Sequence, residues 1–226
     1  MIILAVHTTT RRLSAAVTQN GRVLHENILP PGREHLENLA PIILGISNRL
    51  KISLEHVDGF AVAVGPGSFS GIRVGLATVK GVALALGKPV VGVSSLEILA
   101  WLGLTDGEIG AAVIDARRGE LFAGIYRKSG KTVALMKGPF LTKLDLLEKP
   151  AELTDQGNRI VCSERAVENL PEGNPGAWIS RIVTPSASAC ALMAEERFRR
   201  GTLQDLHSIT PLYVRRSDAE DKLRVG

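Results

Sequence analysis

A weak internal repeat constrains the fold of this 226-residue chain more than any other feature of its sequence. The stretch Ala5-Val6-His7 and the apolar positions after it align, 108 residues later, with Val113-Ile114-Asp115 and a matching set of apolar positions. Each copy predicts a strand, a polar turn, a second strand, a hairpin of small residues and a third strand. The matching apolar positions are Leu13, Ala15 and Val17 in the first copy and Leu121, Ala123 and Ile125 in the second.

A duplication of this kind predicts two related lobes that face each other. The N-terminal lobe would span residues 1–105, with the interaction surface and a glycine-rich loop and helix, and the C-terminal lobe residues 106–226. The C-terminal segment is expected to pack back on the first lobe, and each lobe to offer its first hairpin to a cleft. Chance similarity between two hairpins is the alternative that the sequence leaves open.

The order of apolar segments predicts an α/β layered fold. Strands alternate with helices at lengths that are typical of crossover units. Pro41 is expected to end or bend the first helix, because proline removes a hydrogen bond from a helix interior. Strands are predicted at 2–6, 13–17, 23–28, 60–64, 90–93 and 159–162, and helices at about 33–50, 71–86, from 96, and from 186 or 188 to 200.

Composition and charge argue against several classes of protein. The net charge of +4, from 27 basic and 23 acidic residues, is too small to indicate nucleic-acid binding and fits a mixed, solvated surface. Cys162 and Cys190 form no CxxC pair, which fits a reducing cytosol rather than a disulfide framework. The first residues lack a cationic signal-peptide region, and no uninterrupted apolar run reaches the roughly 18 residues of a membrane span. We therefore expect a cytoplasmic protein that does not enter a membrane.

A glycine-rich loop, residues 65–71, joins a predicted strand to a predicted helix. Backbone N–H groups in such a turn can hold an anion at the positive end of the helix, so Gly67 and Ser68 are candidate nucleotide-proximal residues. The loop is neither a Walker A sequence nor a clean GxGxxG, and a generic tight turn is the alternative.

The helix after this loop carries a strip of small residues on one face. Gly71, Gly75, Thr78 and Val82 follow helical spacing, and glycine inside a helix is unfavourable by roughly 0.5–1 kcal/mol relative to alanine. The strip therefore needs a packing reason, which is either this chain's own sheet or a partner subunit.

His7 and Asp115 occupy equivalent places in the repeat and are candidates for a cleft. Two carboxylates would suit a magnesium nucleotide, but imidazole is a poor magnesium ligand, so unaided phosphotransfer is disfavoured. Arg117, Arg118 and Glu120 in the second hairpin are candidates for a cleft or partner contact, with a solvated charged turn as the alternative. The sequence shows no HExxH, no GxSxG elbow and no metal-ligand spacing, so no catalytic or metal-binding residue is predicted.

Several motifs in a fixed order resemble the TsaB (YeaZ) family. The loop and the start of its helix, Gly65-Pro-Gly-Ser-Phe-Ser-Gly-Ile-Arg-Val-Gly75, resemble the family signature GPGSFTGLRIG. The other matching segments are Ile3-Leu-Ala-Val-His-Thr-Thr-Thr10, Arg33-Glu-His35, Gly92-Val-Ser-Ser-Leu96, Asp115-Ala-Arg-Arg-Gly-Glu120 and Pro211-Leu-Tyr-Val-Arg215. Only about 135–185 is poorly matched.

The resemblance implies a two-lobed actin/Hsp70/sugar-kinase-like (ASKHA, ribonuclease H-like) fold with a duplicated unit. It implies a non-catalytic paralogue of the transferase TsaD, acting as a scaffold in the synthesis of N6-threonylcarbamoyladenosine (t6A) at position 37 of ANN-decoding tRNAs. TsaD would be the docked partner, TsaE an associated ATPase, and a homodimer the isolated form, with tRNA reached only through the complex. The implied partner interface comprises the glycine strip and Arg33, His35, Leu36 and Leu39. A leucine at Gly75 would then abolish pairing and leave the monomer folded.

One departure from the family pattern bears on cofactors. The family usually reads DTS where this chain has His7-Thr8-Thr9, so an aligned phosphate-loop aspartate is missing. The chain is therefore expected to need no cofactor of its own, with an adenine nucleotide at a subunit boundary left open. The alternatives are an ATP-dependent small-molecule kinase or ATPase of the same fold and, third, a glycoprotease-type metallopeptidase.

Overall fold

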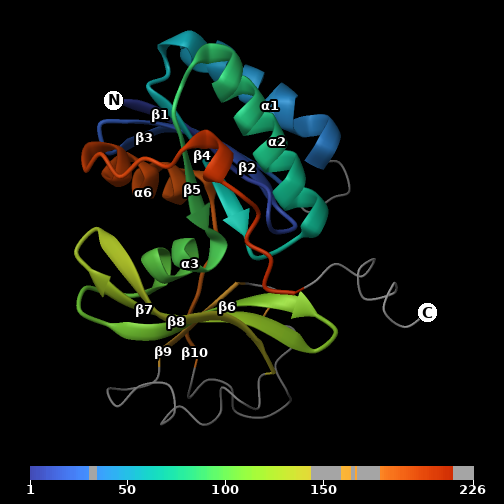
Figure 1. Ribbon diagram of the computed structural model, residues 1–226, viewed down its shortest axis with the longest axis vertical. Helices are drawn as coiled ribbons and strands as arrows, with labels where there is room; N and C mark the ends of the chain where they lie inside the picture. Colours follow the sequence, from blue (N-terminus) through green and yellow to red (C-terminus); the bar gives the residue numbers. More distant parts are fainter. Residues whose placement is uncertain (31–34, 144–158, 164–165, 167–178, 216–226) are drawn as a thin grey trace.

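The computed structural model of the chain describes residues 1–30, 35–143, 159–163, 166 and 179–215 (Figure 1). The strands are β1 (Ile2–His7), β2 (Leu13–Gln19), β3 (Arg22–Leu29), β4 (Gly59–Gly65), β5 (Val90–Ser94), β6 (Ile109–Arg117), β7 (Glu120–Ser129), β8 (Thr132–Thr142), β9 (Arg159–Cys162) and β10 (Ile179–Ile182). The helices are α1 (His35–Leu50), α2 (Phe69–Leu86), α3 (Ser95–Gly103) and α6 (Ala187–Arg199), with short 3-10 turns η1 (Leu54–His56) and η4 (Leu206–Ser208).

Two five-stranded sheets repeat one topology. The first has the order β3-β2-β1-β4-β5 and the second β8-β7-β6-β9-β10. In each sheet the first three strands in this order pair antiparallel and the last two join in parallel. The first hairpins pair in the same sense but differ by one residue in register, since Val6 lies opposite Ala15 whereas its counterpart Ile114 lies opposite Phe122. The predicted duplication is therefore confirmed at the level of the sheets.

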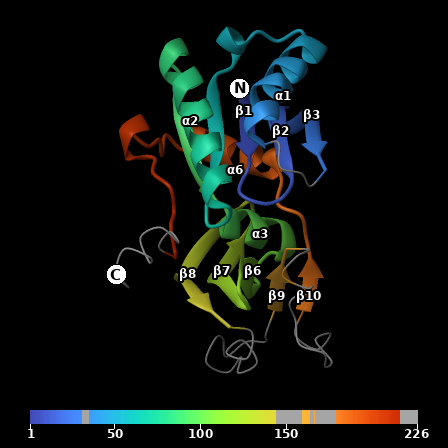
Figure 2. The same cartoon turned by 90° about the vertical axis from the view of Figure 1, so that its right-hand side faces the viewer.

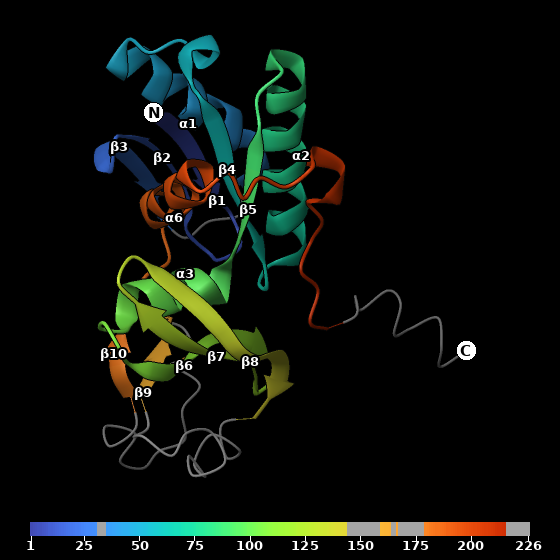
Figure 3. The same cartoon turned by 60° about the vertical axis from the view of Figure 1, so that its left-hand side comes forward.

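Helices cover both faces of the first sheet. Side chains alternate along β1, so that Leu4 and Val6 face the core beneath α1 and α2 while Ile3 and Ala5 face α6. Figure 3 shows α6 on the other side of this sheet from α1. Helix α6 thus packs on the first sheet although the chain reaches it from the second, through β10.

Helix α3 lies between the two sheets (Figure 1). Leu96 and Leu99 pack into the core of the second sheet, whereas Ile98 packs into the layer beneath α6. At its C-terminal end, Lys128 and Arg181 donate to the carbonyls of Trp101 and Gly103. Cations at this end complement the helix dipole, so two strands of the second sheet hold the C-terminal end of α3.

Helix boundaries differ from the predictions in two places. Helix α1 continues through Pro41, because the apolar positions on either side of it, including Leu39 and Ile43, stay buried in one core. Helix α2 begins at Phe69, two residues early, since the Ser68 hydroxyl accepts a hydrogen bond from Gly71 N. By length and composition α2 is the one described helix that could cross a membrane, a test that core helices also pass, and its inner face packs on the first sheet.

Candidate functional site

The glycine-rich loop packs against this chain's own β1–β2 turn. A Cβ at Gly67 would lie 2.2 Å from the Thr9 carbonyl oxygen, and one at Gly71 would lie 2.0 Å from the Thr8 carbonyl oxygen. Ser68 N donates to Thr9 O at 2.7 Å, and Thr8 Oγ1 donates to Gly71 O at 2.6 Å. Two of the loop's backbone N–H groups, those of Ser68 and Gly71, are therefore hydrogen-bonded within the lobe, which favours the tight-turn alternative for this loop.

His7 lies in a buried polar chain rather than at the surface. Its side chain is fully buried, and Nε2 lies 3.1 Å from Thr9 Oγ1. Thr9 Oγ1 lies in turn 2.7 Å from the hydroxyl of Ser95, in the first turn of α3. This chain of contacts links β1 to the helix between the sheets, and it gives His7 a structural role.

The equivalent turn in the second lobe is exposed and conformationally strained. Asp115 is half-buried, and its Oδ1 accepts a hydrogen bond from Arg117 N at 2.9 Å. Arg117 and Arg118 are exposed and adopt left-handed backbone angles, with φ of 63° and 59°. Arg118 and Gly119 form a two-residue hairpin loop, which requires positive φ, and arginine adopts such angles less readily than asparagine or glycine. Glu120, at the start of β7, forms an ion pair with Arg215.

The residues predicted to face a partner divide into inner and outer sets. Leu39 is 1% exposed in the first-lobe core, and Gly71 and Gly75 are buried against Thr8, so these three are accounted for by packing within the chain. Thr78 and Val82 are half-buried. His35 and Leu36 belong to α1, but their side chains, like Arg33 as a whole, lie outside the described residues.

The burial of Gly75 also corrects the expectation for its replacement by leucine. A Cβ there would lie 2.4 Å from Thr8 Oγ1, within a buried hydrogen-bonded cluster. Loss of pairing with a fully folded monomer is thus the wrong expectation, because the larger side chain would disturb the lobe itself.

The outer faces of α1 and α2 carry small and apolar residues. Leu44 of α1 is 54% exposed and Leu84 of α2 is 68% exposed. Ala77 and Gly81 of α2 are exposed as well, and a Cβ at Gly81 would meet no atom within 4 Å. Together these four residues define what we call the outer helix face.

Sequence reasoning missed an aromatic and cationic cluster at the start of α2. Phe69 and Tyr213 stack with ring centroids 4.2 Å apart, and Arg73 Nε donates to the Tyr213 hydroxyl at 2.9 Å. The guanidinium also lies over the Phe69 ring, 4.9 Å from its centroid. The i, i+4 spacing of Phe69 and Arg73 was a visible signal, but Tyr213 is 140 residues from Arg73.

Comparison with known proteins places the chain in a family. Residues 23–168 match the family described as tRNA N6-adenosine threonylcarbamoyltransferase, TsaD. The chain is 27% identical over 227 residues to the tRNA threonylcarbamoyladenosine biosynthesis protein TsaB of Bacillus subtilis, covering 98% of this chain and 97% of that protein. It also superposes on YeaZ from Pseudomonas aeruginosa with a TM-score of 0.78 and 27% identity, over 94% of this chain and 99% of that one. The chain belongs to the TsaB (YeaZ) family.

A more distant likeness supports the fold. The ROK hexokinase of Thermus thermophilus superposes with a TM-score of 0.50 at 14% identity, covering 89% of this chain and 100% of that one. At this identity the likeness shows the fold alone, and it confirms the predicted sugar-kinase-like architecture of the TsaB family member. Among the residues that the structure describes, no group of three or more histidine, cysteine or acidic side chains is placed to hold a metal ion.

Proposed function

We propose that this chain is a non-catalytic subunit that docks a TsaD-type transferase, and through it a TsaE-type ATPase, for the synthesis of threonylcarbamoyladenosine in tRNA. Membership of the TsaB family supports a part in this biosynthesis, since the B. subtilis relative bears that name. The observation that carries the docking role is the outer helix face. It exposes apolar and small residues on two helices that lie side by side on one sheet (Figure 1).

The outer helix face suits a partner of related structure. Leu44 and Leu84 offer apolar side chains, while Ala77 and Gly81 allow another helix to approach closely. The match to the TsaD family means that a TsaD partner would present a related lobe. Two related lobes can pair face to face about an approximate twofold axis, and the same face would serve in a homodimer when TsaD is absent.

The non-catalytic part of the proposal is supported by the loop and the first turn. Ser68 N donates to the Thr9 carbonyl, the Thr8 hydroxyl donates to the Gly71 carbonyl, and His7 is buried. These hydrogen bonds leave fewer backbone groups of the loop available to hold a phosphate. An adenine nucleotide would then bind only where the partner completes a site.

A pair of substitutions tests the docking surface. Leu84→Glu places a charge on the outer helix face, and Leu135→Glu does the same on the distant strand β8, where Leu135 is 47% exposed. We expect calorimetry to show binding to purified TsaD weakened by about tenfold or more for the first variant and unchanged for the second. Equal affinities would contradict the proposed interface.

Reconstitution tests the biochemical role. Purified TsaD, TsaE, threonylcarbamoyl-adenylate and tRNA should form t6A only when this chain is added, and Leu84→Glu should lower the yield. Equal t6A formation without the chain would refute the proposal. Magnesium-dependent ATP turnover by the chain alone, lost in Asp115→Ala, would instead indicate a kinase or ATPase.

A further inference from the structure

The last described segment crosses from one lobe to the other. We call residues 204–215 the C-terminal strap. It begins on the first lobe, where the Gln204 side chain accepts a hydrogen bond from Gly92 N at 3.1 Å. Ile209 is 2% exposed in the first-lobe core, and Lys80 Nζ donates to its carbonyl at 3.0 Å. The strap is therefore bound along its length by backbone and side-chain contacts.

The strap next passes the first glycine of the glycine-rich loop at close range. Leu212 N donates to Val64 O at 2.8 Å, and a Cβ at Gly65 would lie 2.9 Å from Leu212 O. Gly65 also has a φ of 110°, which side chains disfavour. This glycine of the family motif is thus required for the approach of the strap rather than for an anion.

Tyr213 anchors the strap on the first lobe. Its ring stacks on Phe69 with an interplanar angle of 5°, and its hydroxyl accepts the hydrogen bond from Arg73. Tyr213 is 41% exposed, so the cluster forms a surface clamp at the start of α2 rather than a part of the core.

The next two residues belong to the second lobe. Val214 packs against the core formed by α3 and the second sheet. Arg215 donates to Ala116 O at 2.7 Å, forms an ion pair with Glu120, and lies over the Phe122 ring at 5.9 Å. Ala116 and Glu120 flank the strained turn, so the Arg215 side chain contacts both ends of this turn.

Figure 2 shows that the strap and the β10–α6 connection lie on opposite sides of the molecule. The two other chain crossings, through α3 and through β10–α6, leave the strap as the one chain connection on its side of the lobe boundary in the described residues. A contact on that side resists rotation of one lobe on the other about the remaining two crossings.

We propose that the C-terminal strap is an inter-lobe latch, with Tyr213 as its first-lobe anchor and Arg215 as a positioning residue for the turn 116–120. The latch fixes the angle between the lobes and holds Arg117 and Arg118 in their left-handed conformation. The geometry that supports this proposal is that the two anchors, separated by the single residue Val214, contact opposite sides of the lobe boundary. The latch does not depend on the TsaD-type partner proposed above.

Hydrogen exchange tests the coupling between the two anchors. Tyr213→Ala removes only first-lobe contacts, yet a latch predicts about tenfold or more faster exchange at the amides of 116–120 in the second lobe. Arg215→Met, which keeps the apolar stem and removes the donors, should accelerate the same amides. Arg200→Met is the matched control, because it breaks an exposed ion pair with Glu196 on α6. Unchanged exchange at 116–120 in Tyr213→Ala would overturn the latch.

A distance measurement tests the lobe angle. Spin labels at Glu55→Cys in the first lobe and Arg127→Cys in the second lie on exposed positions, and both native cysteines are buried. The distance distribution by electron paramagnetic resonance should broaden in Tyr213→Ala and Arg215→Met and stay narrow in Arg200→Met. An equally narrow distribution in all variants would refute the proposal. If Tyr213→Ala fails to fold, Tyr213→Phe, which keeps the stacking and loses only the hydroxyl, should give a smaller broadening, and none would overturn it.

Discussion

The hydroxyl of Thr8 occupies the space that a side chain at Gly75 would need. A Cβ at Gly75 would lie 2.4 Å from Thr8 Oγ1, which is itself fixed by its hydrogen bond to Gly71 O. We therefore predict that Gly75→Ala lowers the free energy of unfolding by about 1–3 kcal/mol, because an overpacked core must shift. Urea unfolding followed by circular dichroism measures this loss.

Gly81, six residues along the same helix, is the matched control. It is exposed, and a Cβ there would meet no atom within 4 Å. Gly81→Ala should raise the free energy of unfolding by about 0.5–1 kcal/mol, since alanine favours the helix more than glycine does. An unchanged or higher free energy of unfolding in Gly75→Ala would show that Gly75 is not constrained by Thr8.

Local signals in the sequence were sufficient for the hairpins of the two sheets, but they did not predict strand β10 (Ile179–Ile182). Asn20-Gly21 predicts a tight hairpin, and the two residues have φ of 50° and 79°, as that turn requires. The repeat predicted the second hairpin, and the structure has it between β6 and β7. Both hairpins depend on residues close in sequence, where the turn residues and the alternation of buried and exposed side chains determine the structure.

Contacts between segments far apart in the sequence could not be predicted from such local signals. Helical spacing placed Gly71 and Gly75 on one face but did not say that Thr8 covers them. The contact between Arg73 and Tyr213 joins residues 140 positions apart, and no periodicity connects them. The motif ending in Arg215 was visible, but its role depends on how the second lobe is folded.

Replacement by valine should have opposite effects on stability at two buried threonines, Thr9 and Thr18. Thr9 Oγ1 contacts both His7 and Ser95, so Thr9→Val leaves two buried polar groups without this partner and should lower the free energy of unfolding by about 1–3 kcal/mol. Thr18 is equally buried, and its hydroxyl has no hydrogen-bond partner among the described residues. Thr18→Val should therefore be neutral or stabilising. Thermal unfolding of both variants gives the comparison, and equal losses would contradict it.

Burial of two thiols and a phenol makes the fold sensitive to alkali. Burial raises the pKa of Cys162 to about 11, that of Cys190 to about 12 and that of Tyr126 to about 12. Each group then holds its proton more tightly in the folded chain than in the unfolded chain, where the thiol value is 9.0. The stability these groups contribute is present below pH 9 and is lost as the pH rises from about 9 towards 12. Urea midpoints should fall between pH 8 and pH 11.

Thiol labelling checks the same burial at constant pH. At pH 8 a thiol reagent should modify Cys162 and Cys190 in urea and leave both unmodified in the native chain, because the reactive thiolate is suppressed and covered. An introduced exposed cysteine, Glu55→Cys, is the control and should react in both conditions. Rapid reaction of the native chain would contradict the burial.

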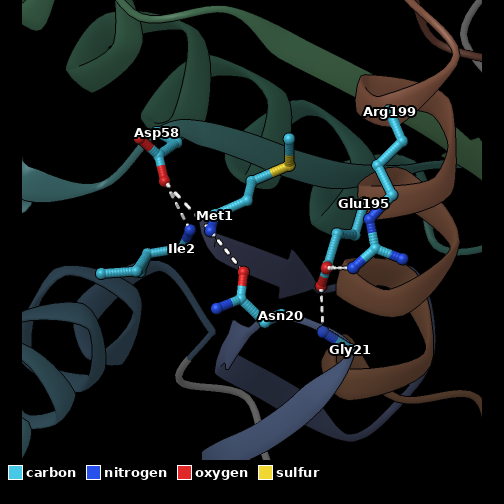
Figure 4. Close-up of polar contacts among 7 residues, drawn as sticks. All are labelled: Met1, Ile2, Asn20, Gly21, Asp58, Glu195 and Arg199. Carbon is cyan, nitrogen blue, oxygen red and sulfur yellow. Dashed lines mark hydrogen bonds and ion pairs between the residues drawn. The ribbon is translucent and has the colours of Figure 1, made fainter.

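Two neighbouring glutamates of α6 differ in their contacts: Glu195 is buried against the β2–β3 hairpin, and Glu196 forms an ion pair on the solvent side. Glu195 is 1% exposed, accepts a hydrogen bond from Gly21 N at 2.8 Å, and forms an ion pair with Arg199 (Figure 4). Glu195→Ala leaves the amide of the β2–β3 hairpin without that acceptor, and we expect a loss of about 1–3 kcal/mol in the free energy of unfolding.

Glu196 supplies the control for this last prediction. It pairs with Arg200 at 2.9 Å on the solvent side of the helix, where the arginine side chain is 58% exposed. Glu196→Ala should cost only about 0–1 kcal/mol, because exposed ion pairs are weakened by water and salt. Hydrogen exchange distinguishes the two further, since only Glu195→Ala should speed exchange at Gly21. Equal losses and an unchanged Gly21 amide would mean that Glu195 does not help to hold α6 on the β2–β3 hairpin.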